Sequence, residues 1–142
     1  MMGLSVNYLA IFIAGIVSLA IGFVWYSPAL FGEPWMKAMG YSKEHIQKVK
    51  RHMIPMYFVS FILTLVMAVL LSYVMSLSLS VLGYTPLTTG LMMAFFVWLG
   101  FVIPVQASDV LFGTTKNWEL FYINAGYQLV SLMAMGTILA II

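Results

Sequence analysis

The chain has 142 residues, of which 63% are hydrophobic and only 7% are charged, and its formal net charge is +2. Soluble domains carry about 25% charged residues, so this composition excludes an ordinary water-soluble fold and indicates a protein whose solvent is lipid. The sequence has no cysteine, which excludes disulfides and thiolate metal sites. Nearly all of its basic residues gather in one loop, unlike the broad basic face of a nucleic-acid-binding protein, so no nucleic-acid partner is expected.

The first long apolar run covers residues 7–26 and contains no charged residue. About 20 apolar residues are needed to cross the hydrocarbon core as a helix, so this run predicts a membrane span. A cleaved signal peptide is the alternative. No Lys or Arg precedes the run, and Ser18-Leu19-Ala20 resembles a cleavage site only weakly, so we predict a retained span.

Residues 27–53 interrupt the apolar pattern with turn signals and charged side chains. Pro34 is suited to open a short helix that Gly40 would end. Ser42 is suited to cap a second helix that continues to about His52. The apolar and charged side chains of this second helix separate onto two faces, which predicts an amphipathic segment at the membrane surface.

Three further apolar runs follow, and the four predicted spans lie approximately at residues 7–26, 54–80, 87–110 and 118–142. The second run exceeds the membrane thickness and should tilt or project, and Gly100 with Pro104 predicts a kink in the third. A β-barrel needs segments that alternate apolar and polar residues, whereas these runs are apolar on every side. The sequence therefore predicts an all-α integral membrane bundle of four transmembrane helices in a single domain, with a short amphipathic cytoplasmic segment between helices 1 and 2.

The basic residues predict the orientation of this bundle. Five of the six Lys and Arg residues lie between the first two spans, and Lys116 lies between the last two. The positive-inside rule places both connections in the cytoplasm. We therefore expect a multi-pass protein of the cell membrane with both termini outside and with membrane lipids as partners.

Small residues recur at every fourth position in the first two spans. They are Ala10, Ala14, Ser18 and Gly22 in the first span, and Ser60, Thr64, Ala68, Ser72, Ser76 and Ser80 in the second. Small side chains let helices approach closely in a bilayer, so these two ladders predict helix contacts and a homo-oligomer formed through one of them. Chance recurrence in a sequence rich in Ser and Ala is the alternative.

Polar residues near the last two spans form a candidate polar face. Asn124, Gln128 and Ser131 share one side of the fourth span because their spacing is i, i+4, i+7. Amides that face lipid are costly, so this side should point into the bundle, either for interhelical hydrogen bonds or to line a ligand pathway. Asp109 could join this face, although interfacial hydration or pairing with Lys116 is the simpler interpretation.

Two histidines are candidate metal or haem ligands. His45 and His52 lie seven residues apart, with Met53 and Met56 nearby, and imidazole with thioether suits soft metals. Two helical turns separate the histidines, so solvated interfacial residues are the favoured interpretation. No catalytic triad, phosphate loop or metal signature is present in the sequence, and we expect no cofactor, no metal and no catalytic residue.

The most distinctive segment follows the first span and has the pattern G-x-x-W-Y-S-P-x-x-F-G-x-x-W from Gly22 to Trp35. Together with Asn7, it resembles the domain-of-unknown-function family 1761. The later stretches Trp98-Leu99-Gly100-Phe101 and Asn124-Ala125-Gly126-Tyr127 are also similar to that family. The resemblance covers essentially the whole chain. It implies four spans in a bacterial inner membrane, and it implies no activity.

The pattern also has a physical interpretation, and its candidate functional or structural residues are Trp25, Tyr26, Ser27, Pro28, Phe31, Gly32 and Trp35. Aromatic rings suit the membrane interface, and the prolines restrict the backbone and lower the entropy cost of ordering it. We expect this segment to form an ordered cap against the cytoplasmic ends of the helices. A loosely held interfacial anchor is the alternative.

Two classes of function remain open on this sequence. The favoured class is a non-enzymatic membrane protein, either a transporter- or channel-like subunit or a structural partner, because no catalytic cluster is visible. The alternative is a membrane enzyme or a protein that binds a cofactor or lipid and acts on a lipid-soluble molecule. The identity of any small-molecule ligand does not follow from the sequence.

Overall fold

The protein, a computed structural model, is described over residues 6–113 and 116–142, a part of the chain that contains helices and no strand. Its elements are α1 (Tyr8–Trp25), α2 (Gly32–Met39), α3 (Lys43–Val49), the 3-10 turn η1 (Lys50–His52), α4 (Met53–Leu82), α5 (Pro86–Val97), the π-helical turn η2 (Trp98–Val102), α6 (Ile103–Phe112) and α7 (Trp118–Ile141). Within these residues, four helical stretches are long and apolar enough to span a membrane: α1, α4, α5 with α6, and α7. The predicted all-α fold with four such stretches is confirmed.

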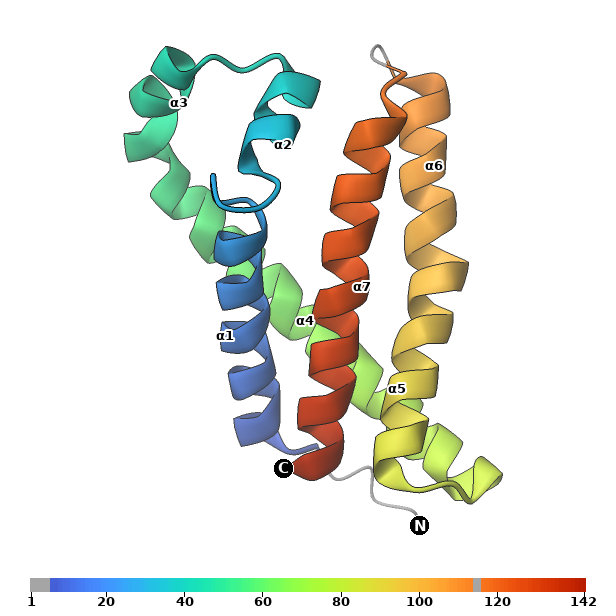
Figure 1. Cartoon of the computed structure of the whole chain (residues 1–142). Coiled ribbons are helices and arrows are strands. Elements are labelled where there is room, and N and C mark those ends of the chain that lie inside the picture. The colour runs from blue at the N-terminus through green and yellow to red at the C-terminus, as the bar shows by residue number, and fades with distance from the viewer. Residues whose placement is uncertain (1–5, 114–115) are drawn as a thin grey trace.

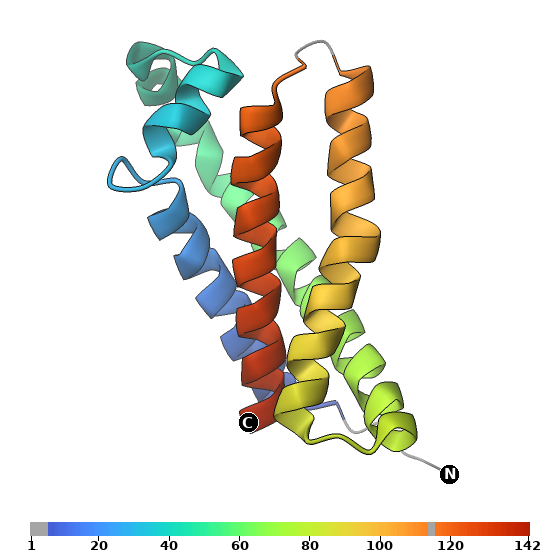
Figure 2. The same cartoon turned by 45° about the vertical axis from the view of Figure 1, so that its right-hand side comes forward.

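Helix α7 lies at the centre of the bundle. It packs along α1 on one side and along α5 on the other, while α4 crosses obliquely behind them (Figures 1 and 2). Helices α2 and α3 lie at the end where α6 finishes and α7 begins, which we call the loop end (Figure 1). The start of α1 and the end of α7 lie together at the opposite end.

The short helices at the loop end follow local capping signals. Gly40 ends α2 with a φ of 72°, a left-handed conformation that glycine adopts at little cost. The Ser42 hydroxyl oxygen accepts a hydrogen bond from the His45 backbone N–H at 3.1 Å and so caps α3. The α-helical part of this segment stops at Val49, and a 3-10 turn then leads directly into α4.

The third long stretch contains a π-helical turn where the sequence predicted a kink. The turn covers Trp98–Val102 and lies just before Pro104, in the first turn of α6. Proline lacks a backbone N–H, and its ring clashes with the carbonyl four residues earlier, here that of Gly100. A wider turn relieves this clash, which explains why regular α-helix gives way at this position.

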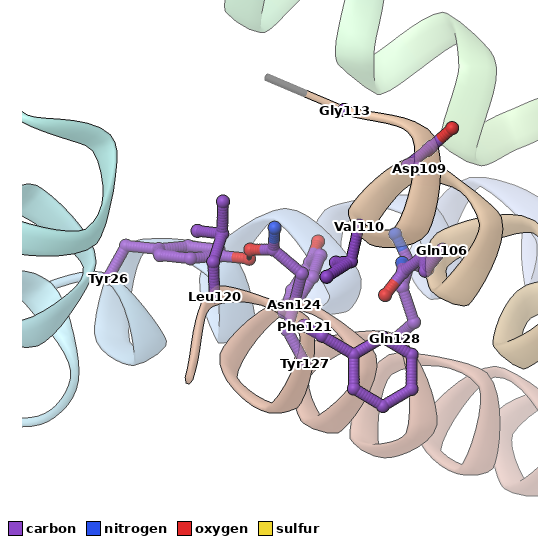
Figure 3. A pocket seen from close by; sticks show the side chains of 10 residues that line it. All are labelled: Tyr26, Gln106, Asp109, Val110, Gly113, Leu120, Phe121, Asn124, Tyr127 and Gln128. Carbon is purple, nitrogen blue, oxygen red and sulfur yellow. Dashed lines mark hydrogen bonds between the residues drawn. The ribbon is translucent and has the colours of Figure 1, made fainter. Parts of the chain in front are cut away.

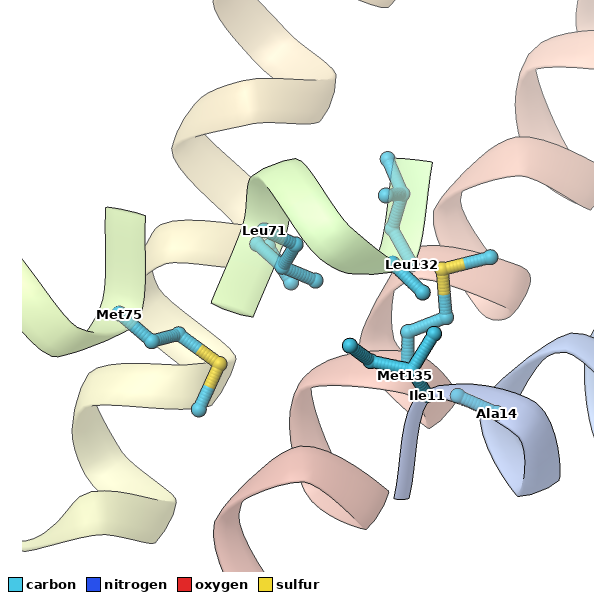
Figure 4. Packing of buried hydrophobic residues seen from close by; sticks show 8 residues of the cluster. Ile11, Ala14, Leu71, Met75, Leu132 and Met135 are labelled. Atoms are coloured by element: carbon cyan, nitrogen blue, oxygen red, sulfur yellow. The ribbon is translucent and has the colours of Figure 1, made fainter. Parts of the chain in front are cut away.

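The apolar core lies where α7 meets α1, α4 and α5, and Leu132 and Met135 are its central side chains (Figure 4). The first small-residue ladder serves this core, because Ala10, Ala14 and Ser18 have no exposed surface. That ladder is therefore a contact within the chain. In the second ladder Ala68 is also completely buried, whereas both ends of the ladder, Ser60 and Ser80, are exposed.

Helices α5 and α7 approach most closely at a pair of glycines. A Cβ atom on Gly136 would lie 2.5 Å from the Gly90 carbonyl oxygen, and a Cβ on Gly90 would meet the Gly136 carbonyl oxygen in turn. Neither contact is possible for real atoms, so the two backbones touch only because both residues lack a side chain. Close approach of this kind is what holds helices together when the surroundings are as apolar as the helices themselves.

Candidate functional site

The aromatic segment, residues 25–35, is bonded to α7. The Trp25 indole N–H donates to the Ile123 carbonyl oxygen at 3.0 Å. The neighbouring Tyr26 hydroxyl donates to Asn124 Oδ1 at 2.7 Å. Contacts between α2 and α7 continue the attachment. These bonds join residues 98 positions apart in the chain, so the segment is held against the loop end of α7.

The turn between α1 and α2 is closed by backbone hydrogen bonds. The Ser27 carbonyl oxygen accepts from the N–H of Leu30 at 3.1 Å and from that of Gly32 at 2.9 Å. The Phe31 N–H donates to the Trp25 carbonyl oxygen at 3.0 Å. A Cβ on Gly32 would lie 2.7 Å from the Ser27 carbonyl oxygen. Only glycine fits there, which explains why the second G of the G-x-x-W-Y-S-P-x-x-F-G-x-x-W pattern is a glycine.

The rings of this segment pack on one another. The Trp25 and Phe31 ring centroids are 4.6 Å apart, and those of Tyr26 and Trp35 are 5.6 Å apart in an edge-on arrangement. Tyr26 also lies 5.5 Å from Tyr127 of α7. Aromatic pairs at these separations are favourable beyond the area that they bury. The rings therefore connect α1, α2 and α7 into one cluster.

A pocket of about 490 Å³ opens beside this cluster, between α6 and α7 at the loop end (Figure 3). A volume of this size is typical of small-molecule sites. Three of its side chains are the predicted polar face Asp109, Asn124 and Gln128. The complete lining is Tyr26, Gln106, Asp109, Val110, Gly113, Leu120, Phe121, Asn124, Tyr127 and Gln128.

The polar groups of the pocket differ in their surroundings. Asp109 is exposed, and Figure 3 shows its carboxylate turned away from Asn124. Gln106 Oε1 is buried, and no residue that the structure describes donates a hydrogen bond to it. Burial raises the pKa of the Tyr26 phenol, and the neighbouring Tyr127 adds to this rise. A phenol is protonated at neutral pH with or without this rise, and the Tyr26 O–H donates to Asn124 Oδ1.

Two indole groups hold the wall of the pocket on either side of Asn124. The Trp25 N–H bonds the carbonyl of Ile123, and the Trp98 N–H bonds the carbonyl of Ala125 at 2.8 Å. One indole belongs to α1 and the other to the π-helical turn, so two separate elements form hydrogen bonds with the backbone of α7. This restrains the backbone that carries the polar face.

The structure separates the candidate residues that the sequence singled out. Asp109, Asn124 and Gln128 line the pocket together with Tyr26. Ser131, which shares their helical face, is 2% exposed and does not line the pocket.

The candidate metal ligands remain at the surface. The His45 ring stacks on Tyr41 at 5.0 Å, and both His45 and His52 are exposed. In the described part of the chain, no three His, Cys, Asp or Glu side chains come close enough to hold a metal ion.

Sequence reasoning missed Gln106 and the part that Trp98 plays. A signal for the first was present, because Gln106, Asp109, Val110 and Gly113 follow the i, i+3, i+4, i+7 spacing of one helical face. The partner of Trp98 had no such signal, since a backbone carbonyl on a distant helix leaves no mark in the sequence.

These features define a class of protein: a small α-helical bundle with four stretches, among the described residues, long and apolar enough to span a membrane, and a polar pocket at one end. A family model described as "Protein of unknown function (DUF1761)" matches residues 9–140. The chain therefore belongs to this family, and the resemblance inferred from its sequence is confirmed. No curated protein and no solved structure matches the chain.

Proposed function

We propose that this protein is a non-enzymatic membrane protein that binds a small molecule inside its helix bundle, as a transporter-like subunit does. The observation that carries the proposal is the pocket between α6 and α7. Polar side chains on apolar helices are costly, and they are generally found where they meet a partner or line a cavity. Gln106, Asn124 and Gln128 bring three amides to one such cavity.

The chemistry of the lining supports binding rather than catalysis. General acid–base or nucleophilic catalysis uses paired groups within hydrogen-bond reach of each other. Asp109 is the one carboxylate among the pocket residues described, and it lies on the outer side of the pocket. The remaining polar groups are amides and phenols, which are suited to orient a ligand.

The proposal predicts a ligand that stays bound during gentle purification. Native mass spectrometry of the wild-type protein should reveal a bound molecule, and Gln128→Met should reduce its occupancy about 5- to 10-fold, because Met keeps the side-chain volume but removes the amide hydrogen bonds. Gln47→Met, at an exposed position on α3 outside the pocket, is the matched control and should leave occupancy unchanged. Equal occupancy in wild type and Gln128→Met would contradict a ligand site in this pocket.

We also propose that the protein lies in a bacterial inner membrane with its loop end in the cytoplasm. Lys37, Lys43, Lys48 and Lys50 lie at or beside α2, α3 and η1, and Lys116 lies just before α7, so the positive-inside rule orients the bundle. A reporter active only in the periplasm should work when fused after Ile142, and a cytoplasmic reporter should work when inserted next to Lys43. The reverse pair of activities would refute this orientation.

Association with a second copy and with membrane lipids is a further proposal. Because the first ladder is used inside the chain, the exposed ends of the second ladder, Ser60 and Ser80, are the remaining small-residue surface for a homo-oligomer. The native mass spectra described above report this directly. A purely monomeric mass across detergents and lipid nanodiscs would exclude the oligomer.

A further inference from the structure

The third long stretch is held firmly to α7 before its π-helical turn. Helix α5 touches α7 backbone to backbone at Gly90 and Gly136, and Ala94 of α5 has no exposed surface. The Trp98 indole N–H, at the first residue of the turn, donates to the Ala125 carbonyl oxygen of α7 at 2.8 Å. Helix α5 is therefore fixed to α7 up to the start of the turn.

Beyond the turn, the attachment of α6 is looser. At the loop end α6 lies at the edge of the bundle beside α7, while α4 runs towards α3 on the opposite side of α7 (Figures 1 and 2). Val110, at 7% exposed, is the one buried residue of α6, whereas Leu111 and Phe112 are exposed. The Ser108 hydroxyl donates to the Pro104 carbonyl oxygen of its own helix at 2.9 Å. Side-chain contacts with α7 are therefore few on this half of the stretch.

The π-helical turn between these two halves is suited to act as a hinge. Its Trp98 carbonyl oxygen accepts from the N–H of Ile103, five residues later. Pro104 has no N–H to donate to the Gly100 carbonyl, four residues earlier. A Cβ on Gly100 would meet nothing within 4 Å, so there is free space beside the turn. π-helical turns are frequently found at functional sites, and a few residues between rigid elements are enough to form a hinge.

The position of α6 determines the width of the pocket, because one of its walls belongs to α6 and the residue that follows it. This wall consists of Gln106, Asp109, Val110 and Gly113, and α7 supplies the facing wall (Figure 3). Gln106 Oε1 is buried in this arrangement, and no described residue donates to it. Buried acceptors are nearly always hydrogen-bonded, so the closed arrangement lacks a bond that an outward position of α6 would allow.

We propose that α6 is a hinged gate of the pocket, which pivots at the π-helical turn while α5 stays fixed to α7. In this structure the gate is in its inner position. In the outer position the wall that carries Gln106 and Val110 moves away from α7, and a ligand enters or leaves. This inference rests on the proposed function and adds how the same site is opened. The movement itself needs no ligand, so it can be tested without one.

The test follows the reaction of a single buried thiol on α6. The chain has no cysteine, so Val110→Cys provides a unique thiol at a buried position. Iodoacetamide should label it slowly in the full-length protein in phosphatidylcholine nanodiscs, by way of the outer position of α6. Intact-protein mass spectrometry measures the rate. Gln47→Cys, at an exposed position on α3, reports the rate of a freely accessible thiol.

Pro104→Ala should slow the labelling of Val110→Cys about 5-fold, because alanine supplies an N–H for the Gly100 carbonyl and one hydrogen bond shifts an equilibrium by about this factor. Gly100→Ala restricts the same turn and should also slow the labelling. Pro86→Ala is the matched control and should leave the rate unchanged. Pro86 lies in the first turn of α5, where a backbone N–H has no partner within the helix.

A second buried thiol separates a moving gate from a general change in the bundle. Ile123 is 5% exposed on α7 and does not line the pocket, so Ile123→Cys should react equally fast in the wild-type and Pro104→Ala backgrounds. Unfolding exposes thiols and speeds labelling, so slower labelling cannot result from a loss of folded protein. If Pro104→Ala does not fold, Gly100→Ala decides in its place.

Equal labelling of Val110→Cys with and without the hinge substitutions would overturn the gate. Equal slowing of both buried thiols would overturn it as well. A ligand that is lost in Gln128→Met, together with unchanged labelling in Pro104→Ala, would overturn the gate and leave the proposed function standing. Slower labelling in Pro104→Ala without any co-purified ligand would support the gate and contradict the ligand site alone.

Discussion

Replacing Gly136 by alanine is expected to lower the free energy of unfolding by about 3 kcal/mol, the upper part of the usual range for overpacked sites. The new methyl group would lie 2.5 Å from the Gly90 carbonyl oxygen and 3.3 Å from the Ala94 Cβ. The first of these is backbone, so α5 and α7 must move apart. The loss is measured by thermal unfolding in a fixed detergent.

Gly100→Ala is the matched control for this substitution. Gly100 also belongs to a helical stretch, but a Cβ there meets nothing within 4 Å. Alanine loses less conformational entropy than glycine, so this variant should unfold at the wild-type temperature or slightly above it. If both variants melt as the wild type does, the two glycines are not a tight contact between α5 and α7.

Trp25→Ala is expected to destabilise the protein by roughly 3–5 kcal/mol, the range for removal of a packed aromatic side chain. The indole donates to the Ile123 carbonyl, lies 4.6 Å from the Phe31 ring and approaches Gly126, whose Cβ would be 3.0 Å from it. Its loss should also speed hydrogen exchange through residues 29–36. Thermal unfolding in one detergent and exchange followed by mass spectrometry measure the two effects.

Trp118→Ala provides the comparison. Trp118 begins α7, is 44% exposed and has Phe121 as its aromatic neighbour. Its removal should therefore cost much less. Similar melting of the two variants, with exchange at residues 29–36 unchanged in Trp25→Ala, would mean that residues 25–35 are an interfacial anchor and not an ordered cap.

Local features of this chain could be predicted because they depend on residues close together in the sequence. Long uncharged apolar runs determine membrane-length helices, since a backbone in lipid must satisfy its own hydrogen bonds. The end of α2 at Gly40 and the cap of α3 by Ser42 depend on a few neighbouring atoms.

The same reasoning predicted only the part of the candidate site that lies on α7. Helical spacing predicted that Asn124 and Gln128 share a face, and the cost of amides in lipid predicted that this face turns inward. Spacing does not say which helix lies opposite. Gln106 and Tyr26 join the site from α6 and from the end of α1, an arrangement that is set by packing alone.

Amino-acid sequence alone therefore determined the four long apolar helical stretches, the end of α2 at Gly40, the cap of α3 at Ser42 and the segregation of basic residues to one end of the bundle. Tertiary structure decided that α7 is central, that the first small-residue ladder is buried within the chain, and that Trp25 and Trp98 hold the carbonyls on either side of Asn124. The physical reason is that lipid is as apolar as a helix interior, so hydrophobicity does not distinguish a helix neighbour from the membrane. Close backbone contacts and individual hydrogen bonds determine which helices are neighbours, and these interactions join residues far apart in the chain.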